Sequence, residues 1–450
     1  MEKKIIQVNE RPPIQKAIPL SIQHMFAMFG ASVLVPSLFG INPAVVLLMN
    51  GLGTLFFIWI TKGKAPAYLG SSFAFIGPAL IIMTKYEAAG MTHMQAFAVA
   101  QSGFVVVGIA MGVLAAVIYR FGTKWIDIVL PPAAMGPVVA LIGLELAGNA
   151  ASNGGLIATA KAPVNPKNVV VFLVTVCVAV FGSILFRRFL SALSILIAIV
   201  AGYIAAAFAG IIDFAPVVQA GFFSLPHFQI ADFGHPDAML TMLPVLLVIA
   251  SEHIGHQIVT SKVVGRDLLK DPGLHRSLLG DSISTTVSGL IGSVPTTTYG
   301  ENIGVMAMTG VYSVWVIGGA AVLSVLCGLL GKMSALIATI PQPVIGGVSF
   351  LLYGMIGTSG LRILVDKKVS YDRPRNQILT AIVFVTGLSG VSLEIGQVEL
   401  KGMVLASVVG MLLGLLFWIF DKLHLANDSE AEKPRQEQDA EARKTAGAER

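Results

Sequence analysis

The stretch TTTYGENIGVMAMTG, residues Thr296 to Gly310, places a carboxylate and an amide among glycines and threonines, with an apolar run on either side. Glu301 is the only charged residue between Asp281 and Lys332. A charged side chain is costly in apolar surroundings, and residues kept there commonly serve binding or proton transfer. The stretch therefore predicts a functional site, provided that its surroundings are apolar in the folded protein.

The composition predicts that those surroundings are a lipid bilayer. The chain has 450 residues, of which 55% are hydrophobic and 12% charged, and its mean hydropathy is +0.80. Soluble domains carry about 25% charged residues, and a soluble chain of this size could not bury so much apolar surface. The net charge of +5 comes from basic residues dispersed between apolar runs, which argues against nucleic-acid binding. The two cysteines lie in apolar runs and predict no disulfide framework.

Apolar runs along the chain predict eleven helices that cross or nearly cross the bilayer. They begin near Ala17, Ala44, Gln95, Ala133, Val169, Leu193, Met239, Val311, Val344, Ile378 and Met403. Three segments, 67–84, 283–292 and 299–309, are shorter and rich in Gly, Ser and Thr. We interpret them as interrupted or internally packed spans, so the chain is predicted to be an all-α polytopic membrane protein with fourteen transmembrane segments.

The distribution of basic residues predicts the orientation of these spans. With fourteen crossings both termini lie on one side, and most of the 30 Lys and Arg residues fall on that side. Because cytoplasmic loops carry an excess of Lys and Arg, both termini are predicted to be cytoplasmic. The charged, aromatic-free tail 423–450 is expected to be disordered. The opposite side receives Lys85, Lys161, Lys167, Lys332 and Lys401.

Short matches between the two halves of the chain indicate an internal repeat. PAYLGSSFAF begins at Pro66 and PTTTYGENIG at Pro295, 229 residues later, and the same offset relates Gln23-His24 to Glu252-His253. This offset places Ser72 opposite Glu301. Each half then holds seven spans, an odd number, so the second half is inverted relative to the first. Paired, glycine-interrupted segments in such repeats point to the central binding site of a transporter.

The interrupted segments supply hydrogen-bond donors, and the neighbouring spans supply titratable groups. A chain that turns helical near Ser71 or Gly300 exposes free N–H groups and the positive end of a helix dipole. Glu252 and His256 lie four residues apart, hence on one helical face, and form a predicted cluster with Glu301. Burial disfavours the charged forms of such groups, so the cluster is predicted to exchange protons. The alternative is that these carboxylates only form structural hydrogen bonds, and we expect His253 to have a structural role; His24 could brace the first span against the tenth.

Catalysis and metal binding have little support in the sequence. EHIGH differs from the zinc motif H-E-x-x-H, because its histidines stand at i and i+3 and the glutamate precedes both. No cofactor and no metal is expected. An ion channel would not need convergent titratable groups in a closed site, so a transporter is favoured over a channel or an intramembrane enzyme.

Several motifs resemble the nucleobase–ascorbate transporter family, also called nucleobase:cation symporter 2, and within it the bacterial uracil permeases. They extend from Glu10 to about Phe420 and include QHMFAMFGASVLVP, PAYLGSSFAFIGP, SEHIGHQIVTSKVVGRDLLKDPGLHRS and TTTYGENIGVMAMTG. The family signature N-x-G-x-x-x-x-T is satisfied by Asn302, Gly304 and Thr309. Two positions depart from the pattern, since Asn is expected at Thr296 and a basic residue is common at Gly310.

The resemblance implies a 7+7 inverted repeat divided into a core and a gate domain, with short strands in the third and tenth spans. The segments it implies are a cytoplasmic segment 1–16, the core 17–120 and 239–332, the gate 121–238 and 333–422, and the tail 423–450. A homodimer in the cell membrane is compatible with the family.

The resemblance also implies the function, a uracil:proton symporter that imports uracil by alternating access. Glu252 and Glu301 would accept hydrogen bonds from uracil, the backbone N–H groups of Phe73 and Gly300 would donate to its carbonyls, and His256 would handle ligand or protons. Supporting residues would be Ser72, Tyr299, Asn302, Ser349, Tyr353 and His24. The alternative of the same fold is a proton symporter for purines such as xanthine or urate.

Overall fold

The computed structural model describes residues 5–426 except 124, 159–162 and 188. Lys124, Lys161, Arg188 and residues 427–450 of the predicted tail therefore lie outside the described residues. The described part is mostly helical, with two small antiparallel sheets.

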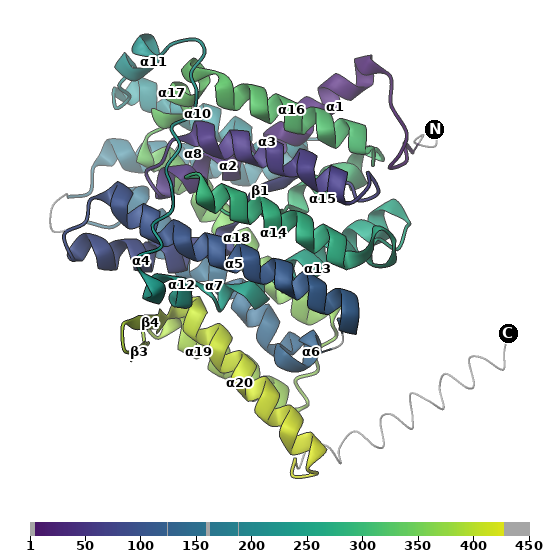
Figure 1. Ribbon diagram of the computed structural model, residues 1–450. Helices are drawn as coiled ribbons and strands as arrows, with labels where there is room; N and C mark the ends of the chain where they lie inside the picture. Colours follow the sequence, from purple (N-terminus) through teal and green to yellow (C-terminus); the bar gives the residue numbers. More distant parts are fainter. Residues whose placement is uncertain (1–4, 124, 159–162, 188, 427–450) are drawn as a thin grey trace.

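The first half of the chain contains helices and one strand (Figure 1). They are α1 (Ile14–Ala27), α2 (Phe29–Leu38), α3 (Pro43–Ile60), β1 (Leu69–Ser71), η1 (Phe73–Phe75), α4 (Ile76–Ala88), α5 (His93–Phe121), α6 (Ile126–Val129), α7 (Pro132–Asn153), α8 (Pro166–Leu185), α9 (Phe189–Ala192), α10 (Ser194–Ala209) and α11 (Ala215–Gln219).

The second half adds the remaining helices and three strands. They are α12 (Pro236–Met242), α13 (Val245–Val264), η2 (Leu269–Gly273), α14 (Leu274–Leu290), β2 (Thr296–Thr298), α15 (Gly300–Thr309), α16 (Val314–Leu329), α17 (Gly331–Ala338), α18 (Gln342–Asp366), α19 (Pro374–Leu388), β3 (Ser392–Ile395), β4 (Val398–Lys401) and α20 (Gly402–Lys422).

Among the described residues, eight helical stretches are long and apolar enough to cross a membrane. The runs expected near Leu193, Val311 and Ile378 form shorter helices, α10, α16 and α19, of 16, 16 and 15 residues. The segment 283–292 is not interrupted within the helix, because its residues 283–290 form the second half of the continuous helix α14 and 291–292 form the turn that follows. Its Ser and Thr side chains are largely buried, so polar composition there reflects close packing rather than a break.

The two strands β1 and β2 come from opposite halves of the chain and pair antiparallel, with Gly70 opposite Thr297. Each strand leads directly into a helix, β1 into η1 and α4, and β2 into α15. Only glycine fits at position 70, because a β-carbon there would lie 2.6 Å from the ring of Tyr299. The pairing brings two helix N-termini, more than 200 positions apart in sequence, to one place in the interior.

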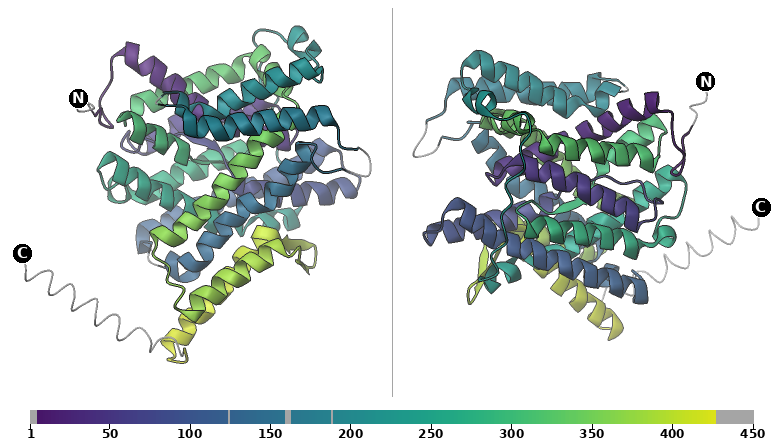
Figure 2. Two further views of the ribbon diagram at one scale, coloured as in Figure 1. Left: turned by 180° about the vertical axis from the view of Figure 1, so that it is seen from behind. Right: turned by 45° about the horizontal axis from the view of Figure 1, so that its top comes forward.

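The longer helices pack in extensive pairs around this crossing. α3 packs on α16 and α5 on α14, whereas α7 packs on α18 and α8 on α10. α8 and α10 lie at one edge of the molecule and α19 and α20 at the opposite edge (Figures 1 and 2). α3, α5, α14 and α16 form one set of helices, and α7, α8, α10 and α18 form a second set. α13 contacts both sets, since it touches α5 and α14 of the first and α7 of the second, and it also touches α20.

The described N-terminal segment adds a strand-like contact to the end of α15. Ile6 donates a 2.9 Å hydrogen bond to the carbonyl of Gly310 and accepts one of 2.8 Å from Tyr312. Arg11 lies over the ring of Trp315, 3.5 Å from its centre. The N-terminal segment and the far end of α20 lie on the opposite side of the molecule from the β3–β4 hairpin (Figure 1).

Candidate functional site

The site is organised by hydrogen bonds that join the two broken segments. The main-chain N–H of Ser72 donates to the carbonyl of Pro295 at 2.8 Å, and the hydroxyl of Tyr299 donates to the carbonyl of Ser71. Tyr299 and Ser72 are the residues immediately before α15 and η1. The residue preceding each helix is therefore tied to the other half of the chain.

The helix N-termini at this crossing keep free donors. Neither Ser72 nor Tyr299 caps its helix with a side-chain hydrogen bond. The first N–H groups of a helix have no intrahelical partner, so Phe73 and Gly300, the first residues of η1 and α15, present donors to whatever lies in front of them. The positive end of the α15 dipole points the same way and favours a polar acceptor.

Helix α13 places Glu252 and His256 beside this crossing. Nδ1 of His256 lies 3.1 Å from the hydroxyl of Thr298 in β2. Its Nε2 lies 3.5 Å from the position of a β-carbon on Gly300, so a larger residue there would contact the imidazole. Glu252 stands one turn earlier on α13, and α13 packs against α15, the helix that carries Glu301.

The two carboxylates differ in accessibility. Glu252 and His256 are half-buried, whereas Gly300 and Glu301 are exposed. Gly304 and Met308, which share a helical face with Glu301, are exposed too. One face of α15 is thus accessible from the strand crossing to the helix end that meets Ile6.

Aromatic rings from three elements enclose the other side of the site. Phe73 packs edge-on against Tyr299, with ring centres 6.4 Å apart, and against Tyr353 of α18 at 6.3 Å. Tyr353 and Ser349, one helical turn apart on α18, are almost fully buried. A flat ring beside Phe73 would therefore meet aromatic surface from both sets of helices.

The remaining predicted residues are buried close to the crossing. Nδ2 of Asn302 lies 3.0 Å from Nδ1 of His24, which joins α15 to α1. The hydroxyls of Ser71 and Ser72 are buried and have no hydrogen-bond partner among the described residues. Buried polar groups are nearly always satisfied, so these hydroxyls are available to a polar ligand or water.

One buried network was predicted only in part. Nδ1 of His253 lies 2.9 Å from Asp281, and its Nε2 lies 2.9 Å from the hydroxyl of Ser277; His253 and Asp281 have no exposed surface. Asp281 of α14 was not among the predicted site residues. Its isolation in an apolar stretch, like that of Glu301, was the signal that could have identified it.

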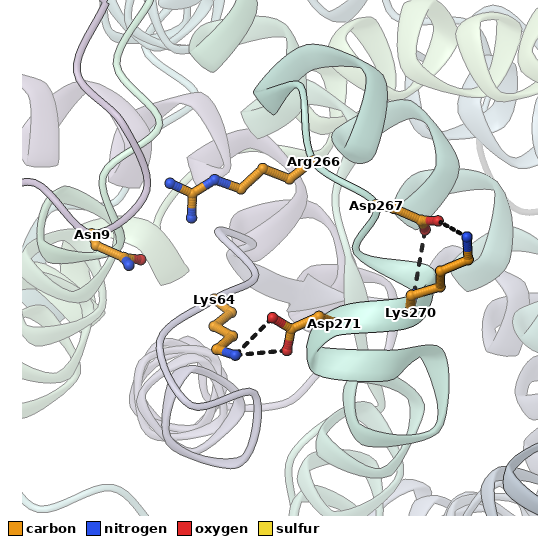
Figure 3. Close-up of a pocket in the computed structure, with 6 residues that line it drawn as sticks. All are labelled: Asn9, Lys64, Arg266, Asp267, Lys270 and Asp271. Carbon is orange, nitrogen blue, oxygen red and sulfur yellow. Dashed lines mark hydrogen bonds and ion pairs between the residues drawn. The ribbon is translucent and has the colours of Figure 1, made fainter.

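A separate cavity of about 600 Å³ lies at the far end of α13 (Figure 3). It is lined by Asn9, Lys64, Arg266, Asp267, Lys270 and Asp271. Lys64 pairs with Asp271 at 2.7 Å, and Lys270 with Asp267 at 3.4 Å. None of the predicted site residues lines it, so it is distinct from the site at the strand crossing. No cluster of metal-ligating side chains occurs within the described ranges.

The fold resembles that of solved membrane transporters. The transmembrane domain of a cyanobacterial bicarbonate transporter, BicA, superposes with a TM-score of 0.63 at 17% identity, covering 92% of this chain and 99% of that one. The murine anion transporter Slc26a9 superposes with a TM-score of 0.69 at 11% identity, covering 92% of this chain and 69% of that one.

The sequence comparisons define the family. Residues 15–396 match the profile of the Permease family that covers nucleobase–ascorbate transporters, and this chain belongs to that family. The uracil permease of Paenibacillus larvae is 52% identical over 95% of this chain and 100% of its own. That of Escherichia coli K12 is 50% identical over 94% and 96%, and that of Bacillus subtilis 45% identical over 92% and 96%. The predicted family is thereby confirmed, and the chain is a membrane transporter rather than an enzyme.

Proposed function

We propose that this protein is a uracil:proton symporter that imports uracil across the cell membrane by alternating access. The observation that supports the proposal is the β1–β2 crossing, where two uncapped helix N-termini meet and α13, which carries Glu252, packs against α15, which carries Glu301. The relatives at 45–52% identity that are named uracil permeases supply the substrate.

The donors and acceptors at the crossing match those of uracil. Uracil has two carbonyl acceptors and two N–H donors around a small flat ring. The backbone N–H groups of Phe73 and Gly300 donate to the carbonyls, and the carboxylates of Glu252 and Glu301 accept from the ring N–H groups. A site built in this way rejects analogues that leave its own buried polar groups unpaired.

Proton coupling is assigned to Glu252, Glu301 and His256. Two neighbouring carboxylates repel one another, which favours uptake of a proton by one of them. Protonation also neutralises the negative charge of a carboxylate, which would otherwise move through the membrane together with the substrate. His256 is held by Thr298 and can exchange a proton with the neighbouring carboxylate.

The transport cycle follows the predicted 7+7 architecture with fourteen spans. The core, 17–120 and 239–332, carries the crossing, and the gate, 121–238 and 333–422, contributes Ser349 and Tyr353. With both termini cytoplasmic, the exposed face of α15 bearing Glu301, Gly304 and Met308 leads from the site toward the cytoplasm. A carboxylate does not face lipid without cost, so this face lines a water-filled exit path.

Uptake of labelled uracil into proteoliposomes tests the proposal. An inwardly directed proton gradient is expected to drive saturable accumulation, with Glu252→Gln and Glu301→Ala each reducing it to the level of empty vesicles. Glu394→Gln is the matched control, because Glu394 lies exposed on the β3–β4 hairpin, and it should leave uptake unchanged. Wild-type uptake in both site variants would remove the proposed site.

A competition panel separates the two nucleobase classes. Unlabelled uracil is expected to compete with labelled uracil more strongly than xanthine or urate does, because the relatives at 45–52% identity are named uracil permeases. Stronger competition by xanthine than by uracil would favour the purine alternative.

A further inference from the structure

The end of α4 farthest from the termini carries a lysine that joins two separate parts of the molecule. Nζ of Lys85 lies 2.7 Å from a carboxylate oxygen of Asp237 in α12 and 2.6 Å from the main-chain carbonyl of Gln397. Asp237 and Gln397 lie 152 and 312 positions from Lys85 along the chain. No site residue considered above takes part in this contact.

Asp237 holds the lysine in position. Its side chain is only 8% exposed, and both of its oxygens also accept from the hydroxyl of Tyr86, at 2.8 and 2.9 Å. The ring of His235 packs against Tyr86, with centres 4.5 Å apart. A buried carboxylate needs a paired charge, so the Lys85 ammonium is anchored at Asp237 and reaches outward from there.

Gln397 belongs to the other part of the molecule. It lies in the two-residue turn between β3 and β4, and the hairpin connects α19 to α20. Leu400 of β4 is buried in the main hydrophobic core, and β4 packs against α12. The hairpin thus closes over the outer ends of α4 and α12, on the side of the molecule opposite the N-terminal segment (Figure 1).

We propose that the hydrogen bond from Lys85 to the Gln397 carbonyl is an outer latch, which holds the core against the gate while the site is open to the cytoplasm. This inference rests on the alternating-access function proposed above. Lys85 and Tyr86 lie in the predicted core. Asp237 is carried by α12, which straddles the predicted boundary at 238/239 but packs mainly on α5 of the core, so it is assigned to the core, and the hairpin to the gate. When the outer side opens, only a bond to a neutral carbonyl is lost, and Lys85 stays paired with Asp237. The latch can therefore release without leaving a buried charge unpaired.

The chemistry of the contact identifies Lys85 as the residue to test. A hydrogen bond from a charged donor shifts an equilibrium by about tenfold or more. Lys85→Met removes the donor and keeps the apolar stem of the side chain, whereas Lys85→Arg keeps a charged donor. The Gln397 side chain is not involved, so Gln397→Ala should leave the latch intact.

A cysteine beneath the latch reports its state. Gly77 of α4 faces Glu145 of α7, and a β-carbon there would lie 3.5 Å from the carboxylate. Gly77→Cys in a Cys177→Ala, Cys327→Ala background places a single thiol at this contact. Glu145→Cys, on the α7 side, is a second probe should the first variant not accumulate in the membrane.

The experiment measures labelling of that thiol by a membrane-impermeant reagent added outside right-side-out vesicles. Lys85→Met is expected to increase the labelling rate about tenfold, and Lys85→Arg to restore the slow rate. The matched control is Lys167→Met, because Lys167 also donates to a main-chain carbonyl, that of Ala209 at 2.9 Å, but lies between helices of the gate alone. In the Lys167→Met variant the thiol should be labelled as slowly as in the parent protein.

The outcomes separate the latch from the proposed function. Equal labelling rates in the parent and in Lys85→Met, for both probe positions, would overturn the latch, whatever the uptake measurements give. Loss of uracil uptake by the wild-type protein would contradict the proposed substrate, while the labelling assay, which contains no uracil, would still report on the latch.

Discussion

The hydroxyl of Tyr299 donates a hydrogen bond to the main-chain carbonyl of Ser71, so the residue immediately before α15 is fixed to β1, the strand that precedes η1 and α4. Tyr299 also covers Gly70 with its ring and packs on Phe73. Tyr299 therefore acts by fixing the relative position of the two helix N-termini, and not by contacting the ligand directly.

Tyr299→Phe should weaken uracil binding without abolishing folding. The ring and its packing stay, but the Ser71 carbonyl loses a buried donor, which costs about 1–3 kcal/mol. If about half of that cost falls on the geometry of the site, KM for uracil rises roughly threefold to tenfold. Uptake kinetics in proteoliposomes measure this, and an unchanged KM would contradict the role assigned to the hydroxyl.

Gly70→Ala should weaken uracil binding strongly, although it adds only one methyl group. The added β-carbon would lie 2.6 Å from the ring of Tyr299, and that ring cannot move without breaking its bond to Ser71. Overpacking of this kind typically costs about 1–3 kcal/mol, so we expect the affinity for uracil to fall by about fivefold to a hundredfold. Binding to the purified protein, measured by calorimetry, provides the readout.

Gly148→Ala is the matched control for that change. Gly148 lies within α7, and a β-carbon there would have no neighbour within 4 Å. Alanine is also favoured over glycine in a helix by about 1 kcal/mol. Equal losses of binding in the two variants would show that the close approach at Gly70 is not responsible.

His253→Leu should destabilise the protein because it leaves Asp281 buried without its partner. Removing one member of a buried pair typically costs about 3–5 kcal/mol, so the midpoint of thermal unfolding in detergent should fall by several degrees. The double variant His253→Leu/Asp281→Leu should recover much of that loss, since no unpaired charge remains. A double variant less stable than the single one would contradict a paired, buried arrangement.

Much of this site could be predicted because its residues are chemically conspicuous. Glu252, His256 and Glu301 stand out as polar residues in apolar runs, and their spacing already places two of them on one helical face. Family motifs extended the prediction to Phe73 and Gly300, which begin η1 and α15 in the structure.

The contacts between distant segments could not be predicted in this way. Tyr299 with Ser71, His253 with Asp281 and Lys85 with Gln397 depend on which helices pack together, and hydrophobic periodicity carries no such information. Segment 283–292 was ambiguous for a related reason. Serines and threonines that bond to the preceding helical turn, as Thr286 does to Ser282, give a polar composition without interrupting a helix.

The most direct test of the account is to measure protons and uracil in the same proteoliposomes, with a pH-sensitive dye inside and labelled uracil outside. Adding uracil to wild-type vesicles is expected to acidify the lumen in step with uptake, whereas Glu301→Gln gives neither signal and Glu394→Gln gives both. Uracil accumulation without any proton movement, or coupled movement that survives in both Glu252→Gln and Glu301→Gln, would contradict the assignment of the carboxylate pair.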